Sequence, residues 1–190
     1  MQTTTANELF SKISWNRFFK LKQMLKDQMN EPTQRFLKSA ILDGALEEYS
    51  DGYFKYVDKT GHDLISECGT RVEVKNLGSQ IKAPDSKSKL DIRIYSKYGS
   101  NNNSCYSDTE IAACLNRFDY LLLIGDSSCG YLSNAELKNS LIEKSDAIIA
   151  RIFHKDVNWL VKDHRVKIHT QRIDLEQVIS KTILDILQSV

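Results

Sequence analysis

The stretch that most constrains the fold of this chain is residues 62–75, which read HDLISECGTRVEVK. Two short runs rich in apolar and β-branched residues flank Glu67-Cys68-Gly69, and Gly69 occupies the position that a three-residue hairpin loop reserves for a positive φ. The pattern therefore predicts a tight antiparallel hairpin. Loop length decides which residues of a hairpin face each other, so the prediction includes a register.

The predicted register places two acidic side chains opposite each other. Counting back from the loop, Leu64 faces Val72 and Asp63 faces Glu73. Cβ atoms of facing residues lie about 5 Å apart, and like charges at such positions destabilise a sheet. A hard divalent cation such as Mg²⁺, which prefers carboxylate oxygen, would explain the arrangement. Lys75 lies on the same face, because side chains along a strand alternate with period two.

Composition places few limits on function. The chain has 190 residues, of which 41% are hydrophobic and 27% are charged, and this predicts a single folded domain over residues 1–190. No apolar run approaches the roughly 20 residues that span a bilayer, and the first residues lack the pattern of a signal peptide. We therefore expect a cytoplasmic protein without a membrane partner. A net charge of +1 neither requires nor excludes nucleic acid as a partner.

The cysteines do not indicate a metal site or a disulfide framework. The four cysteines form no C-x-x-C pair, and no histidines lie near them at zinc spacing. We expect free thiols.

Helices are expected ahead of the hairpin. Apolar residues recur at helical spacing within residues 1–31, an N-terminal helical extension. Its apolar positions, among them Trp15, Phe18 and Phe19, exceed the width of one helix face, which makes this extension a candidate dimer interface. A second helix is predicted over residues 32–48.

The second predicted helix ends in two acids. Glu47 and Glu48 are unfavourable at the negative end of a helix dipole. Two explanations are open. One is an ordinary solvated surface, and the other is a further acidic group directed at the cation between Asp63 and Glu73.

The remaining pattern predicts an α/β fold. A strand over residues 53–57 precedes the hairpin and completes a three-strand antiparallel meander. Loops, strands and helices then alternate, which is typical of a mixed central sheet flanked by helices. The elements expected after the hairpin are a loop over 76–89, a strand over 90–95, a loop over 99–104, a helix over about 107–117, a strand over 120–124, a helix from 133, a segment over 147–153 that is open between helix and strand, a strand over 166–173 and a helix from 174.

The tripeptide acid-x-Lys occurs three times in the chain, as Glu73-Val74-Lys75, Asp85-Ser86-Lys87 and Glu136-Leu137-Lys138. The triplet at Glu136 lies at a predicted helix start, where residues two apart do not face each other. The triplet at Asp85 follows a proline in a predicted loop. Only the triplet at Glu73 lies in a predicted strand with a second acid opposite, so this copy is the one in a context suited to chemistry.

At these residues the sequence resembles the PD-(D/E)XK nuclease superfamily, and within it the type II restriction endonucleases. The resemblance rests on Asp63, Glu73, Val74 and Lys75. It also rests on the predicted order of helix, three-strand antiparallel meander, helix, strand and helix, over about residues 32–125. A restriction-endonuclease-like fold and a prokaryotic source are what the resemblance implies.

The resemblance implies a Mg²⁺-dependent endonuclease that hydrolyses phosphodiester bonds in double-stranded DNA. Asp63, Glu73 and the backbone carbonyl of Val74 would hold Mg²⁺, with Mn²⁺ as a substitute, and Lys75 would contact the scissile phosphate and the attacking water. These roles agree with physical chemistry, because a bound divalent ion neutralises the phosphodiester and lowers the pKa of a water. A lysine ammonium adds stabilisation of the charge that develops in the transition state.

Two details of the family pattern bear on this chain. His62 stands where the family often has proline before its first acid, and the Pro84-Asp85 pair follows the triplet, in the opposite order. By the same resemblance, Glu47 or Glu48 would supply an outer metal contact from the helix before the meander.

Residues 76–106 are the candidate DNA recognition and clamping segment. Cationic side chains can bind phosphates or guanine, and asparagine can pair with adenine. A homodimer would match a palindromic site, as protein symmetry matches operator symmetry. The candidate DNA-binding residues are Lys82, Lys87, Lys89, Arg93, Lys97, Asn101, Asn102 and Asn103.

Two other functions remain open from the sequence. The same fold could serve a structure-specific nuclease for junctions or repair, which would ignore linear duplex and cut branched DNA. The chain could also be a non-enzymatic DNA-binding or interaction protein, whose hairpin charges are solvated surface.

Overall fold

The structure is a computed structural model of the 190-residue chain, and it describes residues 5–29, 35–59, 61–81, 86–96, 108–144 and 147–162. The helices are α1 (Ala6–Ser11), α2 (Trp15–Gln28), α3 (Arg35–Glu48), α4 (Asp108–Leu115) and α5 (Asn134–Lys138), with a 3₁₀ turn at His154–Asp156. The strands are β1 (Phe54–Lys59), β2 (His62–Ser66), β3 (Arg71–Gly78), β4 (Lys89–Ser96), β5 (Tyr120–Gly125), β6 (Cys129–Ser133), β7 (Leu141–Lys144), β8 (Ala147–Phe153) and β9 (Asn158–Val161).

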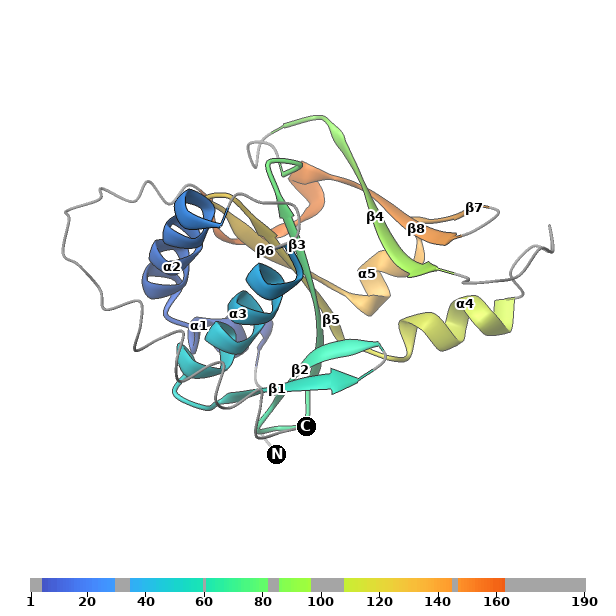
Figure 1. The fold of residues 1–190 in the computed structure, drawn as a ribbon. Helices are drawn as coiled ribbons and strands as arrows, with labels where there is room; N and C mark the ends of the chain where they lie inside the picture. Colours follow the sequence, from blue (N-terminus) through green and yellow to red (C-terminus); the bar gives the residue numbers. More distant parts are fainter. Residues whose placement is uncertain are drawn as a thin grey trace.

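The main sheet has six strands in the order β1-β2-β3-β5-β6-β9. Strands β1, β2 and β3 form an antiparallel meander, β3 runs parallel to β5, and β6 and β9 continue antiparallel. A second sheet has three strands in the order β4-β8-β7. The predicted mixed sheet flanked by helices is confirmed (Figure 1).

The main sheet is buried on both faces. Val72 and Val74 of β3, with Leu122 of β5, belong to the core cluster that α1, α2 and α3 complete. Leu121 and Leu123 belong to a second cluster, which includes residues of α4, α5 and the second sheet. Alternate residues of a strand point to opposite faces, so a nearly continuous apolar run such as β5 fits a strand that is covered on both sides (Figure 1).

The hairpin between β2 and β3 has the predicted loop, and its register agrees with the prediction at the two pairs of the ladder, but the expected pair of Asp63 with Glu73 is not part of that ladder. Gly69 has a φ of 84°, and the Ser66 N–H donates to the Thr70 carbonyl at 2.9 Å. The paired positions are Leu64 with Val72 and Ile65 with Arg71, as expected from a three-residue loop.

Several other boundaries differ from the expectations. β3 continues to Gly78, whereas a loop was predicted from residue 76, because its parallel pairing with β5 extends that far. Residues 147–153 form a strand, which settles the open choice. The short strands β6, β7 and β9 were not predicted. The strand expected over 166–173 and the helix expected from 174 lie outside the described residues.

The aromatic residues of the N-terminal helices are buried inside the chain. Phe18 and Phe19 of α2 are 0% and 1% exposed, and they pack edge to face with ring centroids 5.7 Å apart. The Trp15 indole N–H donates to the Phe10 carbonyl of α1 at 3.1 Å. The apolar surplus of this segment is therefore part of the core cluster that covers the main sheet, and it gives no support to the expected dimer surface.

No helix among the described residues is long and apolar enough to cross a membrane.

Candidate functional site

The β2–β3 ladder follows the predicted register as far as Leu64 and Val72 and opens at Asp63, before the predicted pair of Asp63 with Glu73. In a continued ladder, His62 would face Val74, and its carbonyl would accept the Val74 N–H. Instead, the Val74 N–H donates to Oδ2 of Asp63 at 2.7 Å, while His62 pairs with Lys59 of β1. The Asp63 carboxylate therefore takes the place of the neighbouring strand's backbone at this position.

This opening determines the direction of a backbone oxygen. The N–H and C=O of one residue in an extended strand point to the same side. Because the Val74 N–H points to Asp63, the Val74 carbonyl also points toward the β2 side of β3 and away from β5. The carbonyl that was expected to bind a metal thus faces the same side as the Asp63 carboxylate.

Glu73 and Lys75 lie together on the next positions of β3. They occupy the face that carries Leu121 and Leu123 on the parallel strand β5. The Lys75 ammonium donates to Oε1 of Glu73, and the two side chains are 28% and 14% exposed. The ion pair is therefore largely withdrawn from water but still partly exposed.

Asp43 of α3 is a further acid at this site, and the sequence interpretation did not include it. Burial raises the pKa of Asp43 to about 7, and the negative charges of Asp63 and Glu73 act in the same direction. A hydrogen bond from the Ser39 hydroxyl at 3.5 Å and the positive charge of Lys75 oppose this shift. The pKa of Asp43 therefore depends on the charges of Asp63, Glu73 and Lys75. An acid inside the apolar run AILDGAL was the signal for it in the sequence.

The structure gives Glu47 and Glu48 other contacts. Oε2 of Glu47 accepts the Tyr56 N–H of β1 at 2.9 Å. Glu48 lies 3.9 Å from the Arg17 guanidinium, in an ion pair exposed to solvent. Asp43, one helical turn before Glu47, is the acid of α3 whose charge interacts with the hairpin acids.

The donor set fits a hard divalent cation that keeps part of its water shell. Among the described residues, no three His, Cys, Asp or Glu side chains form a ready-made metal cage. Mg²⁺ does not require one, because it is usually bound by one or two carboxylates together with waters and substrate phosphates. The carboxylates of Asp43, Asp63 and Glu73 offer only oxygen, and repulsion from Asp63 and Glu73 adds to the effect of burial in raising the pKa of Asp43. A cation would relieve that repulsion.

Of the other two acid-x-Lys triplets, the described one at Glu136 does not form a comparable site. Glu136 is the N3 residue of a capping box, in which it accepts from the Ser133 backbone and hydroxyl, and Lys138 is exposed. Asp85 lies outside the described residues. Strand context thus separates the triplet at Glu73 from the one at Glu136.

Only some of the expected DNA-binding residues can be placed. Lys87, Lys89 and Arg93 are exposed on β4 or just before it, and the Lys89 ammonium lies 5.3 Å from the centre of the Phe153 ring. β4 belongs to the second sheet. Outside the described residues lie Lys82, Lys97, Asn101, Asn102 and Asn103.

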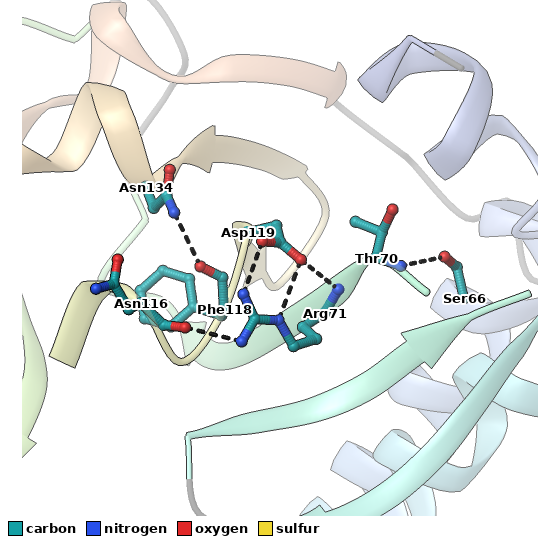
Figure 2. A network of polar contacts seen from close by, with 7 residues as sticks. All are labelled: Ser66, Thr70, Arg71, Asn116, Phe118, Asp119 and Asn134. Atoms are coloured by element: carbon teal, nitrogen blue, oxygen red, sulfur yellow. Dashed lines mark hydrogen bonds and ion pairs between the residues drawn. The ribbon is translucent and has the colours of Figure 1, made fainter. Parts of the chain in front are cut away.

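The opposite end of the hairpin is held by a dense polar network (Figure 2). The Arg71 guanidinium donates to Oδ1 of Asp119 at 3.0 Å and to Oδ2 at 3.3 Å, and Oδ2 also accepts the Arg71 N–H at 2.8 Å. A third guanidinium N–H reaches the Asn116 carbonyl at 2.8 Å. The Thr70 N–H donates to the Ser66 hydroxyl at 3.0 Å. This network fixes β3 to the loop that leads into β5.

Comparisons of the chain with protein-family models, with curated proteins and with solved structures gave no match.

Proposed function

We propose that this protein is a Mg²⁺-dependent endonuclease that hydrolyses phosphodiester bonds in double-stranded DNA, in the manner of a type II restriction enzyme. One observation carries the proposal. The ladder between β2 and β3 opens at Asp63, close to the Glu73–Lys75 ion pair, and the charges of all three residues act on the Asp43 carboxyl of α3. A purely structural hairpin has no need of such a concentration of like charges.

The order of elements supports the same proposal. α3 precedes the meander β1-β2-β3, and α4, β5 and α5 follow, which is the order that the resemblance to PD-(D/E)XK nucleases implies. β4 and β6 are additional to it. This order of elements supports the proposal alongside the residues of the motif.

The proposed roles follow from the chemistry of each group. Mg²⁺ bound here would neutralise the anionic phosphodiester and lower the pKa of a water. Asp63, Glu73 and the Val74 carbonyl would be its ligands, and Asp43 would add negative charge from α3. The Lys75 ammonium, held beside Glu73, would donate to a phosphate oxygen and orient the attacking water.

The test is cleavage of plasmid and linear duplex DNA with Mg²⁺, with Mn²⁺ and with a chelator, followed by mapping of fragment ends. We expect discrete fragments with 5′-phosphates, no cleavage in the chelator, and inactive Glu73→Ala and Lys75→Ala variants. Lys138→Ala is the matched control, because it removes the lysine of another acid-x-Lys triplet. Glu73→Ala or Lys75→Ala protein that cuts like the parent would exclude this site assignment.

The same assay distinguishes the two other functions. Cleavage of branched DNA with linear duplex left intact would indicate a structure-specific nuclease with the same catalytic residues. Binding without cleavage of any DNA would indicate a non-enzymatic DNA-binding protein. The oligomeric state of the active species, measured by light scattering, tests the homodimer.

A further inference from the structure

A hollow of about 580 Å³ is lined by Lys75 and Ser39, which also contact the carboxylates of Glu73 and Asp43. α2 contributes Lys22 and Lys26 to its wall, α3 contributes Lys38, and β3 contributes Lys75. The carboxylate in the wall is that of Asp126, which pairs with Lys26 at 3.1 Å. The wall therefore carries more positive than negative charge.

Lys22 is the least exposed of these lysines. It is 6% exposed, and its ammonium donates to the side-chain oxygen of Asn76. Burial lowers the pKa of Lys22 to about 8, the charges of Lys38 and Lys26 add to the effect, and Asp126 opposes it. A buried ammonium costs free energy unless an anion accompanies it. The Asn76 oxygen is neutral and offsets only part of that cost, so an anion in the hollow would be stabilised.

Two residues of the hollow connect it to the acids of the candidate site. Lys75 lines the hollow and also donates to Glu73. Ser39 lines the hollow and also donates to Asp43. If a polyanion places one phosphate at Lys75, its neighbouring phosphates would therefore lie close to the hollow that Lys75 lines.

We propose that this hollow binds a phosphate of the nucleic-acid backbone next to the scissile phosphodiester, through Lys22, Lys26 and Lys38. The inference rests on the proposed function, because it takes Lys75 as the point where the two sites meet. Lysine ammonium groups act as point charges, so they suit contacts to phosphate that carry no sequence information. α2 and α3 would thus contact phosphates of the DNA backbone, in addition to the DNA contacts expected from residues 76–106.

The test is the affinity of a fluorescent DNA duplex, measured by anisotropy over a range of salt concentrations with Ca²⁺ in place of Mg²⁺. Lys22→Gln keeps a donor for Asn76 but removes the charge, and Lys38→Ala removes a charge from the surface of α3. We expect each to weaken binding about three- to tenfold and to reduce the slope of log affinity against log salt by about 0.9. Lys20→Ala, an exposed lysine of the same helix as Lys22, is the matched control and should leave the slope unchanged.

The outcomes distinguish this inference from the proposed function. If the parent binds and cuts DNA but Lys22→Gln and Lys38→Ala behave like Lys20→Ala, the hollow is not a phosphate site and the nuclease proposal stands. If the hollow variants weaken DNA binding but the parent cuts no DNA with Mg²⁺, the phosphate site stands and the nuclease proposal fails. Binding of pyrophosphate but not of DNA, lost in the hollow variants, would overturn the assignment to nucleic acid. Thermal unfolding of each variant confirms that it is folded, and Lys38→Ala alone keeps the test decisive if Lys22→Gln does not fold.

Discussion

The two ends of the β2–β3 hairpin satisfy their polar groups in opposite ways. At the loop end, the Arg71 guanidinium neutralises Asp119, and the ladder is complete up to the turn (Figure 2). At the far end, the ladder opens and the carboxylates of Asp63 and Glu73 lie near that of Asp43. The contacts at the loop end therefore stabilise the fold, whereas the fold alone does not explain the acidic side chains at the open end.

The pKa values reflect the same contrast. Burial acts to raise the pKa of Asp119, but the hydrogen bonds and charge of Arg71 outweigh it, and the pKa is lowered. Burial raises the pKa of Asp43 to about 7, and the neighbouring carboxylates add to the effect. Strongly shifted pKa values that arise from burial and specific charges are typical of functional sites. The two ends of the hairpin therefore differ in whether a positive charge offsets the burial of a carboxyl.

The largest expected effect is on catalysis. Glu73→Gln and Asp63→Asn should each reduce the cleavage rate by about 10³-fold or more, because several kcal/mol of charge stabilisation is lost. Arg71→Ala, at the loop end, should stay within about threefold of the parent rate. Initial rates on a duplex substrate under single-turnover conditions measure these effects. A similar loss of rate in Arg71→Ala and Glu73→Gln would remove the functional distinction between the two ends.

The second effect is on stability and its pH dependence. An aspartate has a pKa of about 3.9 in an unfolded chain, and folding raises that of Asp43 to about 7. Between these values the unfolded chain binds fewer protons than the folded chain, so the contribution of Asp43 to the free energy of unfolding falls as pH rises from about 4 to about 7. Asp43→Asn should remove this loss, which is on the order of a few kcal/mol.

Urea unfolding at a series of pH values measures the Asp43 effect. The stability difference between Asp43→Asn and the parent should be smallest near pH 4, grow up to about pH 7 and then level off. Asp156→Asn, an exposed acid in the 3₁₀ turn, is the control and should show no such growth. A difference that does not change with pH would mean that Asp43 has an ordinary pKa.

A smaller effect is expected for stability at the loop end. Arg71→Ala should lower the free energy of unfolding by about 1–2 kcal/mol, because it removes a bidentate ion pair and a bond to the Asn116 carbonyl. Arg151→Ala removes a bidentate pair with Asp91 that is similarly exposed, and it should cost less stability than Arg71→Ala. Equal losses in urea unfolding would show that the contact with Asn116 adds nothing.

The smallest effect concerns the hairpin loop. Hydrogen bonds from Ser66 and Thr70 lower the pKa of the exposed Cys68 thiol to about 7. Its alkylation rate, followed by peptide mass spectrometry, should therefore rise with a midpoint near pH 7. The midpoint should move toward the ordinary value of about 8.5 in Thr70→Val. Buried Cys129, whose pKa burial raises, should stay unmodified in the folded protein.

Local turn chemistry made the hairpin predictable. A glycine at the φ-positive position fixed the loop length, and loop length fixed the pairing of Leu64 with Val72. The opening at Asp63 was not predictable, because it depends on His62 pairing with β1 and on a side chain replacing a backbone acceptor. The role of Asp43 depends on how α3 packs against the sheet, which its helical pattern alone does not specify.

The strands that were not predicted, such as β6, also depend on contacts between residues far apart in the sequence. β6 contains Gly130, which has low strand propensity, so its sequence gave little sign of a strand. A Cβ at that position would lie 2.6 Å from a Val157 side-chain carbon, and the close approach of a neighbouring segment therefore requires glycine. That requirement comes from a contact distant in sequence.

The central claim is that the open end of the hairpin binds a divalent cation, and calorimetric titration of Mn²⁺ tests it most directly. The account predicts binding by the parent and by Arg71→Ala, and its loss in the double variant Asp63→Asn/Glu73→Gln. Binding that is absent from the parent, or that persists unchanged in the double variant, would contradict it.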